Sequence, residues 1–197
     1  MKLPRISVEV FRDRGSPDAA VELAVRALQE MNLIFDDGLG VIDSGRLAPL
    51  GYPGVSHVNV DDVPTIETRA DYGVVMTHNP LISSPGLQTE YDERNEIIVG
   101  IAITNGKEKP YGIINSEYPE EVSERAVQHE FGHLMDVKRN GENYDGEWHC
   151  SLEQCTMYRT ATREKSDFCN ECADQAAKYL FMRRRQKAGL LRRLFVL

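Results

Sequence analysis

Histidines and cysteines gather in the last third of this chain, and their spacing constrains the fold more than any other feature. Three of the five histidines and all four cysteines lie there, beginning with the segment His129-Glu130-Phe131-Gly132-His133. Residues four apart on an α-helix lie on the same face, so both imidazoles of this segment can reach one metal ion. The spacing therefore predicts a helix at this point, with the later histidine and the cysteines folding back toward it.

The HExxH pattern is typical of a zinc centre that activates water. Zinc bound by His129 and His133 lowers the pKa of a water ligand to roughly 7, and Glu130 is placed to take its proton as a general base. A proline and two acidic residues precede the motif, as the first turn of a helix favours. We therefore expect an active-site helix over residues 119–135, although the same spacing also occurs by chance on surface helices.

A catalytic zinc needs a third protein ligand. In the pattern HExxHxxGxxH a glycine turns the chain so that a third histidine returns to the metal, but Asp136 and Arg139 occupy those two positions here. The G-x-x-H element recurs ten residues later and ends at His149, after a polar segment, 136–145, that we interpret as an inserted loop. His149 is the expected third ligand, with Asp136 and Asp145 as alternatives. Asp136 is better explained as a polar residue at the helix end or as a partner of the ligands.

The four cysteines form a second metal-ligand pattern. Cys150 and Cys155 are one short-spaced pair, Cys169 and Cys172 are another, and thirteen residues separate the pairs. This spacing is close to that of four-cysteine zinc sites. We therefore expect residues 149–172 to form a structural zinc region, with two disulfides as the alternative.

The redox compartment favours the metal over the disulfides. The first residues lack the apolar run of a signal peptide, and no stretch reaches membrane-spanning length, so a cytoplasmic protein is expected. Thiols stay reduced in the cytosol. Structural zinc contributes about 10–16 kcal/mol to folding, so its removal should unfold the C-terminal part of the chain. Because His149 and Cys150 are neighbours, a zinc on the cysteines would also fix the backbone beside the third histidine. This could hold His149 either within reach of the catalytic zinc or out of its reach.

Together these residues resemble the archaemetzincin family, whose motif runs HExxHxxGxxHC-x4-C-x-M followed by C-x2-C. The matching residues are His129, Glu130, His133, Gly146, His149, Cys150, Cys155, Met157, Cys169 and Cys172, and Phe168 is also similar. The inserted segment and the eleven residues between Met157 and Cys169 depart from the family pattern.

The resemblance implies a peptidase with two zinc ions per chain. One would be a catalytic ion on the three histidines, with Glu130 as base, and the other a structural ion on the four cysteines. Met157 would be the methionine of the turn beneath the active site, where its role is packing; a methionine in this setting is otherwise ordinary core filler. Tyr158, which follows it, could approach the metal but is more simply a packed or surface tyrosine.

The whole chain, residues 1–197, is predicted to form one α/β domain. The residues outside the motifs supply its scaffold, in which a mixed twisted sheet carries the metal at its edge. This metzincin-like domain would contain the active-site helix and a C-terminal helix. Hydrophobic periodicity predicts strands at 6–11, 39–42, 72–76, 96–104 and 111–115 and a helix at 17–31. Two surface loops are expected, at 44–68 and 79–94.

An extended peptide substrate could pair with an exposed strand edge, either 96–104 or 111–115. His57 and His78 lie outside the motif and are interpreted as ordinary histidines.

Charge is unevenly distributed between the two ends of the chain. Residues 178–197 hold seven of the 23 basic residues and none of the 31 acidic ones, so the remainder is strongly acidic. An acidic body disfavours nucleic acid as a main partner. The basic C-terminal segment could touch anionic lipid or RNA, but docking on the acidic body or on a second subunit explains it better.

Two functional hypotheses follow. In the first, the protein is a cytoplasmic zinc peptidase that hydrolyses short peptides, with an aminopeptidase-type activity suggested by the resemblance; Glu130 assists attack by a zinc-bound water. In the second, the insertion spoils the third ligand, only the four-cysteine zinc is bound, and the chain is a catalytically weak or inactive relative that acts as a binding module.

Overall fold

The computed structural model describes residues 3–35, 37–48, 50, 57–82, 99–104, 109–137, 149–158 and 167–194. In chain order the elements are β1 (Ile6–Arg12), α1 (Asp18–Ile34), β2 (Leu39–Leu47), β3 (Val58–Asn59), a 3-10 turn (Val60–Asp62), β4 (Tyr72–Thr77), β5 (Leu81–Ile82), β6 (Gly100–Ile103), β7 (Tyr111–Asn115), α3 (Glu120–Leu134) and α4 (Asn170–Leu194). Within the described parts of the chain, no helix is both long and apolar enough to span a bilayer.

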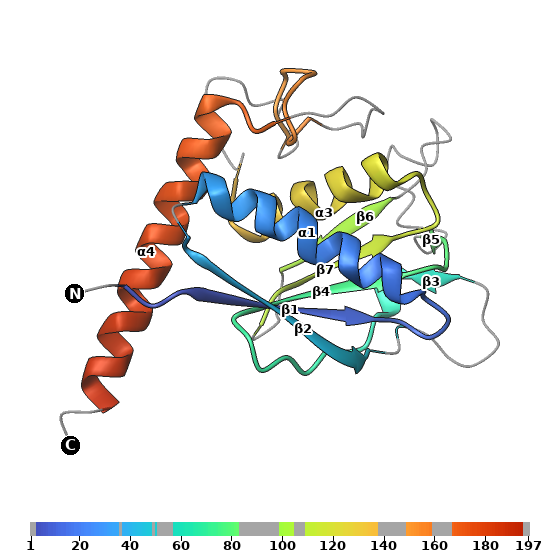
Figure 1. Cartoon of the computed structure of the whole chain (residues 1–197), viewed down its shortest axis with the longest axis horizontal. Helices are drawn as coiled ribbons and strands as arrows, with labels where there is room; N and C mark the ends of the chain where they lie inside the picture. The colour runs from blue at the N-terminus through green and yellow to red at the C-terminus, as the bar shows by residue number, and fades with distance from the viewer. Residues whose placement is uncertain are drawn as a thin grey trace.

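Five strands form a mixed sheet in the order β2-β1-β4-β7-β6, which confirms the predicted α/β class (Figure 1). The four strands from β2 to β7 are parallel, with Val10 aligned to Val74 and Val74 to Gly112. β6 pairs with β7 in the antiparallel direction. Among the described strands, β7 is therefore enclosed on both sides and β6 lies at an edge.

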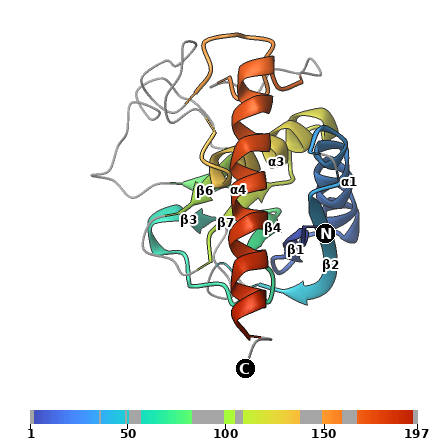
Figure 2. The ribbon, with the colours of Figure 1, turned by 90° about the vertical axis from the view of Figure 1, so that its left-hand side faces the viewer.

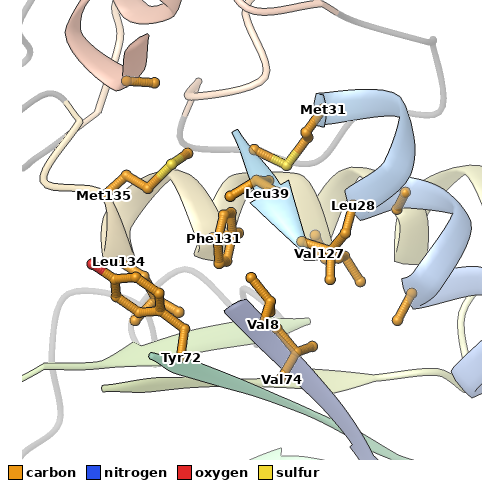
Figure 3. Close-up of a cluster of buried hydrophobic side chains, with 14 of the residues drawn as sticks. Val8, Leu28, Met31, Leu39, Tyr72, Val74, Val127, Phe131, Leu134 and Met135 are labelled. Atoms are coloured by element: carbon orange, nitrogen blue, oxygen red, sulfur yellow. The ribbon is translucent and has the colours of Figure 1, made fainter. Parts of the chain in front are cut away.

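The main hydrophobic core lies between one face of this sheet and the helices α1 and α3 (Figure 3). Alternate residues of the strands point to opposite faces, so Val8 of β1 and Val74 of β4 meet Leu28 of α1 and Val127 of α3. Phe131 packs edge to face on Tyr72, with 5.7 Å between ring centroids. The histidine-bearing helix is thus fixed on the sheet by residues of its own motif.

A second hydrophobic cluster covers the opposite face, and part of it comes from a segment predicted to be a surface loop. Ala48, Leu50, Val58 and Ile66 are all buried against strand residues of that face. The prediction for 44–68 was therefore wrong for much of this segment, which continues β2 to Leu47 and also contains β3. The prolines and glycines of this segment are typical of loops, and its short apolar stretches lack the regular period that would have predicted buried strands. Of the predicted loop 79–94, residues 81–82 form β5, which pairs with β3, and the remainder lies outside the described residues.

α4 runs along one side of the molecule, across the ends of the strands (Figure 2). Its first turns carry Cys172 and its basic half contacts the beginning of the chain. Arg184 donates hydrogen bonds to the carbonyls of Pro4 and Leu3, and Lys187 Nζ lies 2.6 Å from Asp71 Oδ2. This part of the basic segment therefore docks on the acidic body of its own chain, which was one of the two preferred predictions.

Candidate metal centre

Helix α3 brings the first two histidines of the motif together. It begins after Pro119 with acidic residues in its first turn, and it lies within the predicted range of 119–135. The Nε2 atoms of His129 and His133 are 3.0 Å apart. Two ligands of a tetrahedral zinc at about 2.1 Å from the ion lie roughly 3.4 Å apart, so these rings are spaced for one ion.

His149 lies beside this pair, although its neighbours 138–148 fall outside the described residues. Its ring centroid is 5.4 Å from that of His129 and 5.2 Å from that of His133. The ligand atoms of the three rings all lie within 4.8 Å of one another. These three histidines could hold a zinc ion, and the sequence separation of His149 does not prevent its approach.

The chemical state of the rings suits metal binding. His129 Nδ1 lies 2.8 Å from the carbonyl oxygen of Thr156, to which it donates, leaving Nε2 as the acceptor that faces the other rings. Burial lowers the pKa of His129 to about 4, and it lowers the pKa of His133 well below its ordinary value, with the nearby imidazoles adding to this effect. Both imidazoles are therefore neutral at pH 7, as metal ligation requires.

Glu130 follows His129 directly on α3 and packs against Gly100 of the edge strand. Its side chain is buried, and the backbone N–H of Ala102 in β6 donates to its carboxylate. Burial raises the pKa of Glu130 to about 8, against the effect of that hydrogen bond. A carboxyl group with such a pKa, next to a metal-ligand cluster, is suited to exchange protons near neutral pH.

Asp136 ends the helix in the backbone conformation that glycine favours. Its φ is +58°, its N–H donates to the His133 carbonyl at 2.9 Å, and the N–H of Val137 donates to the Gly132 carbonyl at 3.1 Å. These two bonds are those of a Schellman motif. Asp136 is not in the histidine group, so its placement agrees with a residue at the helix end. The other alternative ligand, Asp145, lies outside the described residues.

The four cysteines converge on a second point. Their Sγ atoms all lie within 4.8 Å of one another, and those of Cys150 and Cys169 are 3.9 Å apart. Thiolates of a tetrahedral zinc, at about 2.3 Å from the ion, lie roughly 3.8 Å apart, whereas a disulfide needs about 2.05 Å. All four are free thiols, so the structure does not adopt the disulfide alternative.

One of these thiols is poised to ionise before a metal arrives. A hydrogen bond from the Cys172 thiol and the backbone N–H of Cys169 lower the pKa of Cys155 to about 5. The same interaction raises the pKa of Cys172. This interaction favours the thiolate form of Cys155, which is the form that binds zinc.

Met157 packs against α3 at Gly132. A Cβ placed on Gly132 would lie 2.3 Å from Met157 Sδ, so the sulfur fills the space that this glycine leaves. Tyr158 donates its backbone N–H to the Cys155 carbonyl. His57 and His78 belong to neither metal-ligand group of the described residues.

Some residues of the centre were not predicted from the sequence. The carboxyl end of Glu130 fits between α3 and β6 because Gly100 carries no side chain, and the isolated glycine in that strand was the available signal. Arg125, one turn before His129, is buried and donates to the carbonyl of Cys155 at 2.8 Å. Nothing in the apolar pattern of the helix indicated this role.

Comparison with solved structures shows an archaemetzincin-like fold. Archaemetzincin from Methanopyrus kandleri is similar over 89% of this chain and 96% of that chain, with a TM-score of 0.64 and 16% sequence identity. Metalloproteinase-II from Bacteroides fragilis is similar over 89% of this chain with a TM-score of 0.54 and 12% identity, and the match spans 53% of that chain. No protein-family model matches the chain, and no curated protein matches its sequence.

Proposed function

We propose that the protein is a zinc metallopeptidase, with a catalytic zinc on His129, His133 and His149 and a structural zinc on the four cysteines. The observation that carries this proposal is the convergence of three imidazoles beside a buried glutamate. The fold similarity supports it, since one of the two structures is named a metalloproteinase and the other an archaemetzincin, the family that the sequence motif resembles. Zinc at this position would polarise the scissile carbonyl and activate water.

Glu130 is the residue that moves protons in this proposal. Its carboxyl group lies between the histidine-bearing helix and β6, and burial makes it a stronger base than an exposed glutamate. It would accept the proton of the attacking water and then deliver it to the leaving amine, which is the general acid–base role of a group with a pKa near the working pH. His129 and His133 stay neutral and hold their orientation, the former through the Thr156 carbonyl.

The peptide substrate would bind along β6. β7, one of the two strands considered for this role, is paired on both sides, whereas β6 has one side unpaired among the described strands. Along an antiparallel pair, residues that hydrogen-bond to the neighbouring strand alternate with residues that do not. Asn115 N–H donates to the Val99 carbonyl, so the backbone groups of Gly100 and Ala102 face away from β7. Because Ala102 also donates to Glu130, an extended peptide on this edge would pass beside the base. We propose short peptides as the substrate class and an aminopeptidase-type cleavage as the activity.

Replacing Glu130 by Gln tests the mechanism. The variant keeps the size of the side chain but removes its basicity, so turnover of a mixed short-peptide library should fall by about 10²–10⁴-fold. Both zinc ions should remain, as counted by native mass spectrometry. Glu121→Gln, an exposed change in the first turn of the same helix, is the matched control and should retain full activity. Turnover that survives E130Q would reject this role for Glu130.

The alternative of an inactive binding module makes a different prediction about metal content. It expects one zinc per chain, on the cysteines, in protein purified without added metal. Anomalous scattering at the zinc edge would then show a single peak, whereas the proposed enzyme should show a second peak among the three histidines. The mutual approach of the three rings favours the enzyme.

A further inference from the structure

We propose that Arg125 is a positioning residue that couples the four-cysteine group to the histidine group. This inference rests on the proposed use of both groups as metal sites. It concerns the turn formed by residues 155–157, which lies between the two groups and is contacted by three successive turns of α3.

Successive residues of the turn contact successive turns of the helix. Arg125 donates from Nη2 to the Cys155 carbonyl at 2.8 Å, and His129, four residues later, donates to the Thr156 carbonyl at the same distance. Three residues further, Gly132 leaves the space filled by Met157. Residues at these intervals share one helix face, so the turn is fixed to that face residue by residue.

The turn also belongs to the cysteine group. Cys155 contributes its thiol there, and the backbone N–H of Cys169 donates to that sulfur at 3.3 Å. The carbonyl of Met157 accepts from the N–H of Cys150 at 2.8 Å, which links the turn to the residue beside His149. A metal on the cysteines would therefore hold the turn through Cys155, and Arg125 holds the carbonyl of the same residue.

The charge of Arg125 supports the same role. The residue is 4% exposed, so its guanidinium has lost most of its water, and burial lowers its pKa, although the nearby Cys155 thiolate opposes that shift. Four thiolates around a divalent zinc carry a net charge of about −2, which a buried cation at close range stabilises. Arg125 thus has a reason to be charged and buried at this place.

The consequence is a coupling between the two metal sites. Occupancy of the cysteine group would hold the Thr156 carbonyl at the distance that orients His129, and binding at the histidines would strengthen the cysteine site by the same factor. Removing Arg125 would loosen the turn while leaving every metal ligand in the chain.

The test compares Arg125→Met with Arg26→Met in the two-zinc protein. Arg26 is the matched control because it contacts Glu120 and Glu124 on the same helix from the outside. Zinc affinity at the histidine site is measured by chelator competition with the cysteine site still filled. R125M should weaken it by about 10-fold or more, in the range seen when hydrogen-bond partners of metal ligands are lost. The His129 Nδ1 proton, followed by NMR, should exchange faster with water in R125M, and R26M should match wild type in both measurements.

Unchanged zinc affinity and proton exchange in a folded R125M would overturn the proposal. Arg125→Lys keeps the charge and one donor, so it should fall between wild type and R125M. A further measurement needs only the wild-type protein: in equilibrium competition with a chelator, the cysteine site should bind zinc more tightly when the histidine site is filled than when it is empty. Equal affinities would reject the coupling even if neither variant folds. None of these readouts depends on peptide hydrolysis, so an inactive E130Q or an unreactive peptide library leaves their outcome unaffected.

Discussion

Glu130 fills the space in which a side chain at Gly100 would stand. A Cβ at Gly100 would lie 2.7 Å from Glu130 Cγ, closer than real Cβ atoms approach, and 3.1 Å from its Oε1, tighter than an ordinary van der Waals contact. The edge strand and the motif helix therefore approach each other only because one of the two facing residues has no side chain. The position of the proposed base depends on a glycine that lies 30 residues before it in the sequence.

Gly100→Ala should reduce peptidase activity more than it reduces stability. The added methyl group must displace the Glu130 side chain, and a misplaced base slows catalysis by about 10²-fold. Gly40→Ala in β2 is the control, because a Cβ there meets its nearest neighbour at 3.7 Å, an ordinary contact. Initial rates on a peptide substrate and thermal unfolding of both variants provide the comparison. Full activity in G100A would show that Glu130 does not need this position.

The features predicted correctly from the sequence are those that depend on local spacing. The strand at 111–115 has the predicted bounds, and the HExxH segment is helical, because period and helix-start residues act within a few positions. Gly100 beside Glu130 and Arg125 beside Cys155 are contacts between distant segments, and neither follows from a local period. Ala48 and Leu50 were missed for the same reason, since their burial depends on the second face of the sheet.

Asp136→Gly should stabilise the protein, and Asp136→Ala should destabilise it. Both substitutions remove the carboxylate, but at φ +58° glycine relieves the strain of a left-handed residue and alanine does not. We expect a difference of about 1 kcal/mol between the two variants in urea unfolding. Equal stabilities would mean that the backbone conformation at the helix end differs from the one described.

Lys187→Ala should loosen the C-terminal half of α4. Lys187 Nζ is hydrogen-bonded to the carboxylate of Asp71 and to the carbonyl of Arg5, and the Lys187 and Asp71 side chains are only partly exposed. The loss should be about 1 kcal/mol, because the ion pair is partly screened by solvent. Arg185→Ala, an exposed basic residue in the same helix, is the control. Hydrogen exchange of amides near residue 187 should increase in K187A and remain unchanged in R185A.

Removing all metal should unfold the region around the cysteines before the sheet. The turn at 155–157 and the start of α4 are joined through the four thiols, and zinc binding of about 10–16 kcal/mol is comparable with the stability of a whole domain. After treatment with a strong chelator, amides of 149–158 and 167–180 should lose hydrogen-exchange protection, while those of β1 and β4 retain more of theirs. Cys172→Ser should show the same pattern without a chelator. Full protection in the chelated protein would show that the thiols do not support this region through a metal.

The buried carboxyl group of Glu130 should make the protein less stable as the pH rises, once the histidine site is stripped of metal. Its pKa is about 8 in the folded state and near 4.5 as its ordinary value, so between these values the folded protein holds a proton that the unfolded chain releases. The free energy of unfolding must fall as the pH rises through this window, by at most about 1.4 kcal/mol per pH unit. His129 and His133 act in the opposite direction below pH 6.5, because their folded pKa values are lowered.

Glu130→Gln isolates the contribution of the carboxyl group, since both histidines remain in the variant. The wild-type stability relative to E130Q should decline between pH 5 and about pH 8 and then level off. Urea unfolding at several pH values, on protein that retains only the cysteine-bound zinc, gives this difference directly. Parallel curves for the two proteins would show that Glu130 is ionised in the metal-free site at pH 7. The cost of burying the charged carboxylate against β6 would then be offset by interactions stronger than the single hydrogen bond from Ala102.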